Sequence, residues 1–220
     1  MTTNEKDMRD RISSKAHGLV MKYGVRSVSM DDIANALGIS KKTIYQYFVD
    51  KDELVEAIIE NTLHENQLRC NEHRANAQNA VQEIFSAKQL LREMFADMNP
   101  SVLYDLQKYH PKAFTRFLKH KNDFLFGLLK SNIERGIAEE LYRTEINVDI
   151  ITRFRIESMM MPFNPDFFSK HKHSLLEVEE QLLEHFLFGI VSLKGYKLVL
   201  KYKQESEKNA SKYETISKAK

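Results

Sequence analysis

A run of side chains with hydrogen-bonding ends stands in the first quarter of the chain. On a short helix, one outward face would carry Lys41, Lys42, Thr43, Gln46 and part of Tyr45. A lysine can donate hydrogen bonds to guanine edges or phosphates, a threonine methyl can touch a thymine methyl, and a glutamine can bind adenine. These residue types favour contact with the major groove of DNA, although the solvated face of an ordinary helix would carry them too.

Two helices joined by a tight turn must position those side chains. The segment Ile33–Phe48 reads IANALGISKKTIYQYF, and its inward apolar set is Ile33, Leu37, Ile39, Ile44 and Tyr47. Ala34 is small where the second helix must cross closely, and Gly38 supplies the positive φ that the turn requires. Ser29 and Ser40 are suited to cap the two helices. The joint spacing predicts a DNA-binding helix-turn-helix rather than an ordinary helical hairpin.

Lys51 lies at the start of the next helix, directly after the capping residue Asp50. Its charge and the free amides of that helix end are suited to a DNA phosphate. Basic and acidic residues nearly balance over residues 1–55, and the whole chain has a net charge of +2. A few placed cations, rather than a broad positive field, would therefore hold DNA, so we expect weak non-specific binding.

The run from Ser29 to Ile59 resembles the signature of the TetR family of bacterial regulators. The matching elements are Ile33-Ala34, Leu37-Gly38, Thr43-Ile44-Tyr45, Tyr47-Phe48, Lys51 and Leu54. The resemblance implies a three-helix DNA-binding domain joined by a long fourth helix to a helical domain that binds an effector and forms a dimer. It also implies contacts with DNA at Lys41, Lys42, Thr43, Tyr45, Tyr47 and Lys51, with Ser29 near a phosphate, and the base-reading chemistry above adds Gln46.

The rest of the chain predicts an all-α protein of about nine helices, because only 7 glycines and 4 prolines occur and apolar residues recur at helical spacing. The last of these helices is expected over about residues 174–202. We expect a helix-turn-helix DNA-binding domain over 1–55, an effector-binding and dimerisation domain over 56–203, and a polar, disordered tail over 204–220.

The stretch Leu182–Leu193 is apolar nearly all round, so both of its sides must be covered. One cover would be the chain's own core and the other a second copy, which gives Phe186, Gly189, Ile190 and Leu193 as dimer contacts. A central core helix of a monomer is the alternative. A two-fold dimer would present two recognition helices to a palindromic operator, about 34–36 Å apart or a multiple of that.

Aromatic residues and methionines collect in the middle of the chain. They suit either a plain core or a cavity for an apolar or aromatic small-molecule effector. The candidate lining is Phe85, Phe95, Tyr104, Phe117, Phe124, Phe154 and Met159.

No Gly-rich phosphate loop, nucleophile elbow or zinc-protease motif occurs, so we expect no enzymatic activity, cofactor or metal. Cys70 is the single cysteine, and neither a signal-peptide pattern nor a membrane-spanning stretch is present, which favours a cytoplasmic protein. The sequence therefore predicts a ligand-responsive transcriptional regulator, and the resemblance makes it a repressor. A DNA-binding regulator whose C-terminal domain binds a protein partner is the alternative, and a helical enzyme is a remote one.

Overall fold

The computed structural model describes residues 3–164, 166–168 and 172–218. Over these ranges the chain is all-α, as predicted, with one isolated β-bridge between Tyr142 and Val191. In chain order the elements are α1 (Thr3–Tyr23), α2 (Met30–Leu37), α3 (Lys41–Tyr45), α4 (Lys51–Asn76), α5 (Ala80–Phe95), α6 (Val102–Tyr109), α7 (Pro111–Lys119), the π-helical turn η1 (His120–Leu125), α8 (Phe126–Ala138), α9 (Val148–Ser158), the 3-10 turn η2 (Met161–Phe163), α10 (Leu175–Ile190) and α11 (Leu193–Lys218).

Short-range signals set the helices of the head, as we call α1–α3. Ser29 caps α2 through a capping box with Asp32, and Ser40 caps α3 by accepting from the Thr43 amide. Gly38 ends α2 at a φ of 67°, a left-handed conformation that costs a residue with a Cβ about 1–2 kcal/mol. The predicted helix-turn-helix geometry is confirmed.

The head shares one hydrophobic core with the first half of α4 and with α6. Buried side chains from the head and α4 include Ile12, Ala16, Ile33, Ile44, Phe48 and Leu54. Val102 and Leu106 of α6 belong to the same cluster. The head is therefore held on the rest of the molecule, the body (α4–α11), by shared apolar surface.

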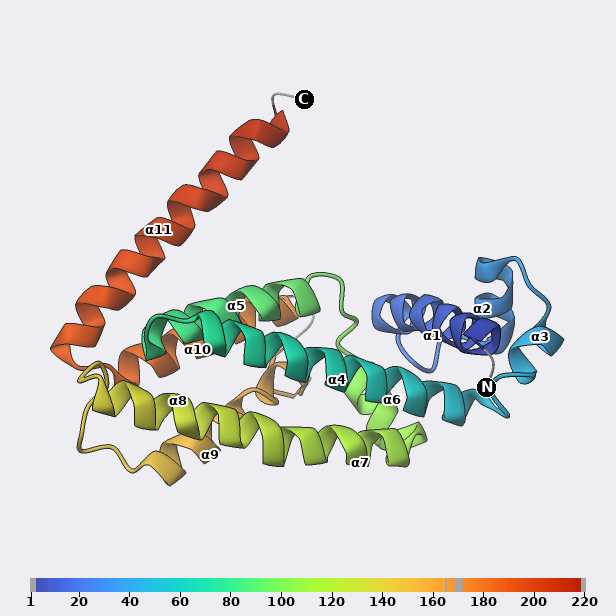
Figure 1. Ribbon diagram of the computed structural model, residues 1–220, viewed down its shortest axis with the longest axis horizontal. Coiled ribbons are helices and arrows are strands. Elements are labelled where there is room, and N and C mark those ends of the chain that lie inside the picture. The colour runs from blue at the N-terminus through green and yellow to red at the C-terminus, as the bar shows by residue number, and fades with distance from the viewer. Residues whose placement is uncertain (1–2, 165, 169–171, 219–220) are drawn as a thin grey trace.

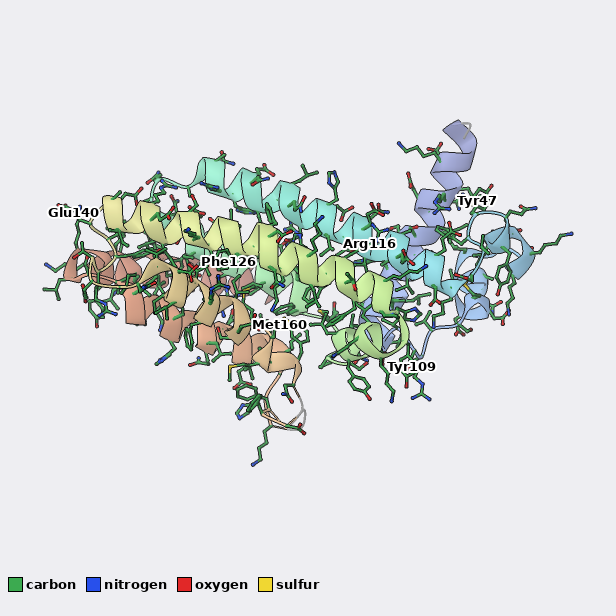
Figure 2. All side chains as sticks on the ribbon, turned by 90° about the horizontal axis from the view of Figure 1, so that it is seen from below. Tyr47, Tyr109, Arg116, Phe126, Glu140 and Met160 are labelled. Carbon is green, nitrogen blue, oxygen red and sulfur yellow. The ribbon has the colours of Figure 1, made fainter. Side chains whose placement is uncertain are left out.

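The body is an elongated bundle in which α4 runs beside the continuous helix formed by α7, η1 and α8 (Figure 1). Arg116 of α7 joins the two through ion pairs with Glu56 and Glu60 of α4, at 3.5 Å and 3.4 Å. A second apolar cluster packs α5, α8 and α10 together with the start of α11. Tyr47, between α3 and α4, and Glu140, just after α8, lie toward opposite ends of the molecule in the view of Figure 2.

The expected single helix over about 174–202 is wrong, because the chain breaks at Val191 and Ser192 into α10 and α11. Val191 is extended, with a ψ of 146°, and pairs with Tyr142. The Ser192 hydroxyl then accepts from the Gly195 amide at 3.1 Å, and Gly195 passes too close to the Leu141 carbonyl for a Cβ to fit. The sequence does not reveal this break, because the pattern of apolar residues continues across Val191 and Ser192.

The structure also corrects the expectation of disorder from residue 204, since α11 remains helical to Lys218. Residues 219 and 220 lie outside the described range. The segment 204–218 contains neither glycine nor proline, and Lys201 pairs with Glu205 one turn later at 3.9 Å. α11 projects away from the bundle (Figure 1).

Candidate nucleic-acid interface and ligand cavity

The helix that would enter the DNA groove, α3, presents a short polar surface. Lys42, Tyr45 and Gln46 are exposed on it, and Ile44 is fully buried beneath them. Thr43 is half-buried, with its hydroxyl 2.8 Å from that of Ser40. These three side chains are therefore presented to solvent, as Lys41 and Ser29 also are, while the Thr43 hydroxyl is already hydrogen-bonded.

Lys41 is tied to the preceding helix. Its ammonium donates to the Asp31 carboxylate at 2.7 Å, and this hydrogen bond raises the pKa of Lys41. Both side chains are well exposed, so the pair contributes little to stability. A DNA phosphate would have to compete with Asp31 for this cation.

Lys51 points back into the molecule. Its Nζ donates to the Val25 carbonyl at 2.6 Å, which fastens α4 to the turn between α1 and α2. Burial lowers the pKa of Lys51, and the carboxylates of Asp105, Asp52 and Asp32 oppose that shift. The free amides at the start of α4 are therefore better placed for a phosphate than the Lys51 ammonium.

Ser29 and Tyr47 have structural roles beside any contact with DNA. The Ser29 hydroxyl donates to the Asp32 carboxylate at 2.6 Å, and this bond lowers the pKa of Asp32. Tyr47 is half-buried, and its carbonyl accepts a hydrogen bond from Arg9.

Arg9 is the residue near α3 that sequence reasoning missed. Its guanidinium lies 4.1 Å from the centre of the Phe48 ring and donates to Glu53 at 2.9 Å as well as to the Tyr47 carbonyl. The Val49 amide, and to a smaller extent Arg9, lower the pKa of Glu53. Arg9 thus fixes the turn between α3 and α4, and its partners lie about forty positions away in sequence, where no local pattern reveals them.

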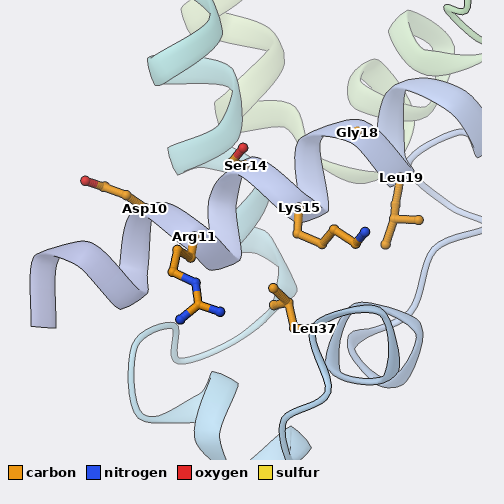
Figure 3. A pocket seen from close by; sticks show the side chains of 7 residues that line it. All are labelled: Asp10, Arg11, Ser14, Lys15, Gly18, Leu19 and Leu37. Atoms are coloured by element: carbon orange, nitrogen blue, oxygen red, sulfur yellow. The ribbon is translucent and has the colours of Figure 1, made fainter. Parts of the chain in front are cut away.

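A shallow hollow lies between α1 and the end of α2 (Figure 3). Its lining is Asp10, Arg11, Ser14, Lys15, Gly18, Leu19 and Leu37. Arg11 and Lys15 extend along its rim, so this hollow carries two exposed cations that were not predicted to contact DNA.

A second, deeper cavity of about 220 Å³ lies inside the body, between α4, α5, the α7–η1–α8 helix, α9 and α10. Three of the predicted lining residues face it, namely Phe95, Phe117 and Met159. The other four do not. Tyr104 and Phe154 are more than half exposed, Phe85 packs on Tyr202 of α11, and Phe124 packs on the His120 ring.

One edge of this cavity carries neutral polar groups from α4 and η1. Gln67 Nε2 lies 3.3 Å from His120 Nδ1, and His120 Nε2 lies 3.1 Å from Asn66 Oδ1. Burial lowers the pKa of His120, and it raises the pKa of the Cys70 thiol to about 11. At neutral pH both side chains are therefore uncharged.

The charged side chains that line the cavity are paired. Lys121 donates to Glu157 at 2.7 Å, and Glu83 accepts from Arg135 at 3.3 Å. The third, Arg155, is almost fully buried and donates to Glu179, whose second oxygen has no hydrogen-bond partner among the described residues. Burial raises the pKa of Glu179, and Arg155 opposes the shift.

α6 connects this cavity to the head. Leu103 lines the cavity, and Asp105, two positions on, accepts from the Arg26 amide at 3.1 Å. Just before α6, the Asn99 amide donates to the Met21 carbonyl at 2.7 Å. One short helix therefore touches both the cavity and the head.

The four predicted dimer contacts divide into two kinds. Phe186 and Ile190 are 4% and 2% exposed and belong to the chain's own core, so their side chains are not on a surface that a second copy could cover. Leu193 is 85% exposed, and a Cβ on Gly189 would meet nothing within 4 Å. Ile150 and Phe154, one turn apart on α9, add a further exposed apolar pair.

Within the described part of the chain, no three His, Cys, Asp or Glu side chains come together as a metal site would require. Nor does any described helix combine the length and apolar character needed to cross a membrane.

Comparison with known proteins gives consistent results. A family model described as bacterial regulatory proteins, tetR family, matches residues 12–58. YvaF, an HTH-type transcriptional regulator of Bacillus subtilis, is 28% identical over 189 residues, covering 84% of this chain and 96% of its own.

Two solved structures share the fold at low sequence identity. A TetR family regulator from Agrobacterium tumefaciens has a TM-score of 0.71 at 18% identity and covers 86% of this chain and 100% of its own. A transcriptional regulator from Saccharomonospora viridis, solved in complex with choline, has a TM-score of 0.68 at 16% identity, with 85% and 99% coverage. The shared fold therefore includes the body as well as the head.

Proposed function

Because this chain is a transcriptional regulator of the TetR family, we propose that it represses transcription by binding a palindromic operator as a homodimer. We further propose that it leaves the operator when a small molecule fills the cavity in the body. The observation that carries this proposal is the double role of α6, where Leu103 lines the cavity and Asp105 holds the head. The neighbour solved with choline supports a small-molecule complex on this fold.

Contact with DNA rests on the surface of α3 and the start of α4. Lys42, Tyr45 and Gln46 would enter the major groove, and the amides at the start of α4 would meet a phosphate. The proposed interface also keeps Ser29, Lys41, Thr43, Tyr47 and Lys51. To bind DNA, Lys41 must release the Asp31 carboxylate and Lys51 must release the Val25 carbonyl. Because net charge is small, two heads joined in a dimer would be needed for useful affinity.

The dimer surface is proposed to include Leu193 and Gly189, with Ile150 and Phe154 of α9 as further exposed apolar groups. In such a two-fold dimer, a change in the position of either head alters the spacing of the two recognition helices. A ligand with higher affinity for the dimer at one spacing shifts the population toward that spacing. The difference between its affinities for the two spacings sets how strongly the ligand can change DNA binding.

The test is to fill the cavity by mutation, which requires no knowledge of the ligand. Ala87 lines the cavity, whereas Ala75 is exposed on α4. The operator is first selected from random DNA with the purified protein, and its binding is then measured by fluorescence anisotropy. We expect Ala87→Phe to weaken operator binding at least about tenfold, or 1.4 kcal/mol, and Ala75→Phe to leave it unchanged. Normal operator affinity in a folded Ala87→Phe variant would contradict ligand control through this cavity.

A further inference from the structure

The walls of the body cavity are hydrocarbon on nearly every side. The apolar lining from α5, α8, α9 and η2 includes Leu90, Leu91, Leu128, Leu129, Ile156 and Met160. A volume of about 220 Å³ equals roughly the space of seven water molecules. It is smaller than the ~300–1,000 Å³ usual for drug-sized ligands, so the occupant must be compact.

Charge pairing argues against an ionic occupant. The carboxylate of Glu83 and the cations Lys121 and Arg155 line the cavity, and each already has a partner of opposite charge. Glu179, which keeps a buried oxygen without a partner, is not among the lining residues. An ionic ligand would therefore lose its hydration without gaining an unpaired counter-charge, which is costly in an apolar site.

At the polar edge of the cavity, the side-chain amide of Asn66 donates to a weak acceptor. Gln67 Nε2 is a hydrogen-bond donor, so His120 Nδ1 must be the acceptor and the ring proton lies on Nε2. His120 Nε2 therefore donates to Asn66 Oδ1. The Asn66 amide nitrogen donates to the sulfur of Met94 at 3.5 Å, in a contact at the exposed margin of the cavity. Thioether sulfur is a weak acceptor, so a ligand oxygen would replace it at little cost.

The polar edge lies at the π-helical turn. In η1 the consecutive residues His120 and Lys121 are both buried, at 7% and 6% exposure. Wide turns of this kind are frequent at functional sites. Here the turn sets His120 against α4 and so orients Asn66.

We propose that the cavity takes a compact, uncharged, mostly hydrocarbon molecule whose carbonyl or hydroxyl oxygen accepts a hydrogen bond from the Asn66 amide. This inference rests on the proposed function, because it names the chemical class of the effector. It excludes both organic cations, such as the choline of the Saccharomonospora viridis complex, and organic anions.

Four probes of similar size separate these classes. Acetophenone is neutral with one carbonyl, ethylbenzene lacks the oxygen, benzoate is an anion and benzylammonium is a cation. Calorimetric titration should show acetophenone binding at least about tenfold more tightly than either ion, and severalfold more tightly than ethylbenzene. Acetophenone should also release the operator at the concentration at which it binds.

Asn66→Leu tests the hydrogen bond itself. We expect it to remove the advantage of acetophenone over ethylbenzene while the affinity for ethylbenzene stays within about twofold, since ethylbenzene makes no hydrogen bond with Asn66. Asn61→Leu, an exposed position on the same helix, is the matched control and should keep the advantage. If Asn66→Leu fails to fold by circular dichroism, Asn66→Ala, which removes the amide donor with less bulk, replaces it.

The outcomes distinguish this inference from the proposed function. Binding of benzoate or benzylammonium as tightly as acetophenone would overturn the ligand class, and so would the absence of binding by all four probes at millimolar concentration. Retention of the acetophenone advantage in Asn66→Leu would overturn the role of Asn66. In each case the effect of Ala87→Phe on operator affinity tests ligand control independently of the ligand class.

Discussion

Lys42 and Gln46 are exposed on the same short helix, yet they suit different kinds of DNA contact. A lysine that pairs with a phosphate strengthens binding to every sequence, whereas a glutamine that pairs with adenine strengthens binding to one. We expect Lys42→Ala to weaken binding uniformly and to reduce the slope of log affinity against log salt by about one.

Gln46→Ala should instead relax the preference at one base pair by about 1–3 kcal/mol, without changing the salt slope. Anisotropy titrations of both variants against operators with single base-pair changes, at several salt concentrations, distinguish the two. A loss for Gln46→Ala that is equal on all sequences would show that this side chain does not read a base.

Arg9 stabilises the turn after α3 through a planar group that a lysine cannot imitate. The guanidinium stacks on Phe48 while bonding to both Tyr47 and Glu53. We expect Arg9→Lys to lower the free energy of unfolding by about 1–2 kcal/mol, because the charge remains but the stacked, forked geometry is lost.

Urea denaturation measures this effect, and Arg11→Lys is the control, because Arg11 is exposed on the same helix. That change should stay within about 0.5 kcal/mol of the wild type. Equal stability of the two variants would mean that the contacts of Arg9 contribute nothing beyond its charge.

At the scale of the elements, two glycines with equal space around them should respond in opposite ways to a methyl group. A Cβ would meet nothing within 4 Å at either Gly38 or Gly18, but Gly38 has a φ of 67° and Gly18 lies inside α1. We expect Gly38→Ala to lower the unfolding free energy by about 1–2 kcal/mol, and Gly18→Ala to raise it by about 0.5–1 kcal/mol.

Thermal or urea unfolding of the two variants provides the measurement. Gly38→Asn should lose less than Gly38→Ala, since asparagine tolerates the left-handed region better. A destabilised Gly18→Ala would instead indicate that the hollow beside α1 needs the glycine.

Elements that depend on near neighbours in sequence could be predicted, and those that depend on distant ones could not. The capping residues Ser29 and Ser40 and the turn at Gly38 are local signals, and the structure confirms them. The break at Val191 depends on its pairing with Tyr142, about fifty positions earlier. No period in the sequence contains that information.

The cavity lining shows the same limit. Aromatic type suggested Tyr104 and Phe154, yet both helices turn other residues inward, namely Leu103 on α6 and Arg155 with Ile156 on α9. The paired charges that make the cavity unsuited to ions join helices far apart in the chain, as Arg155 does with Glu179. The residue types predicted that a cavity could form. Which side chains line it is decided by the packing of the helical bundle.

For the whole molecule, buried histidines make stability depend on pH. Burial lowers the pKa of both His17 and His120, so below about pH 6.5 the unfolded chain binds protons that the folded chain does not. The free energy of unfolding should therefore be highest above this pH and should fall as the pH drops from about 7 toward 5.

Urea titrations at several pH values measure this fall, and His120→Phe should make it shallower, whereas His64→Phe, at an exposed position, should leave it unchanged. The variant comparison is needed because burial raises the pKa of Glu83 and Glu179, which acts in the opposite direction with pH. An identical pH dependence in His120→Phe would show that this ring does not titrate between the two states.

The double role of α6 also bears on how such a protein could diversify. Leu103 and Asp105 are separated by about 3 Å of helical rise, so the link between cavity and head occupies a single short helix. The largest share of the lining comes from α5, and α8 and α9 add to it; these three helices are separate from that link. Under the proposed function, substitutions in those helices would alter which molecule is recognised, while the connection between the cavity and the head would be inherited intact.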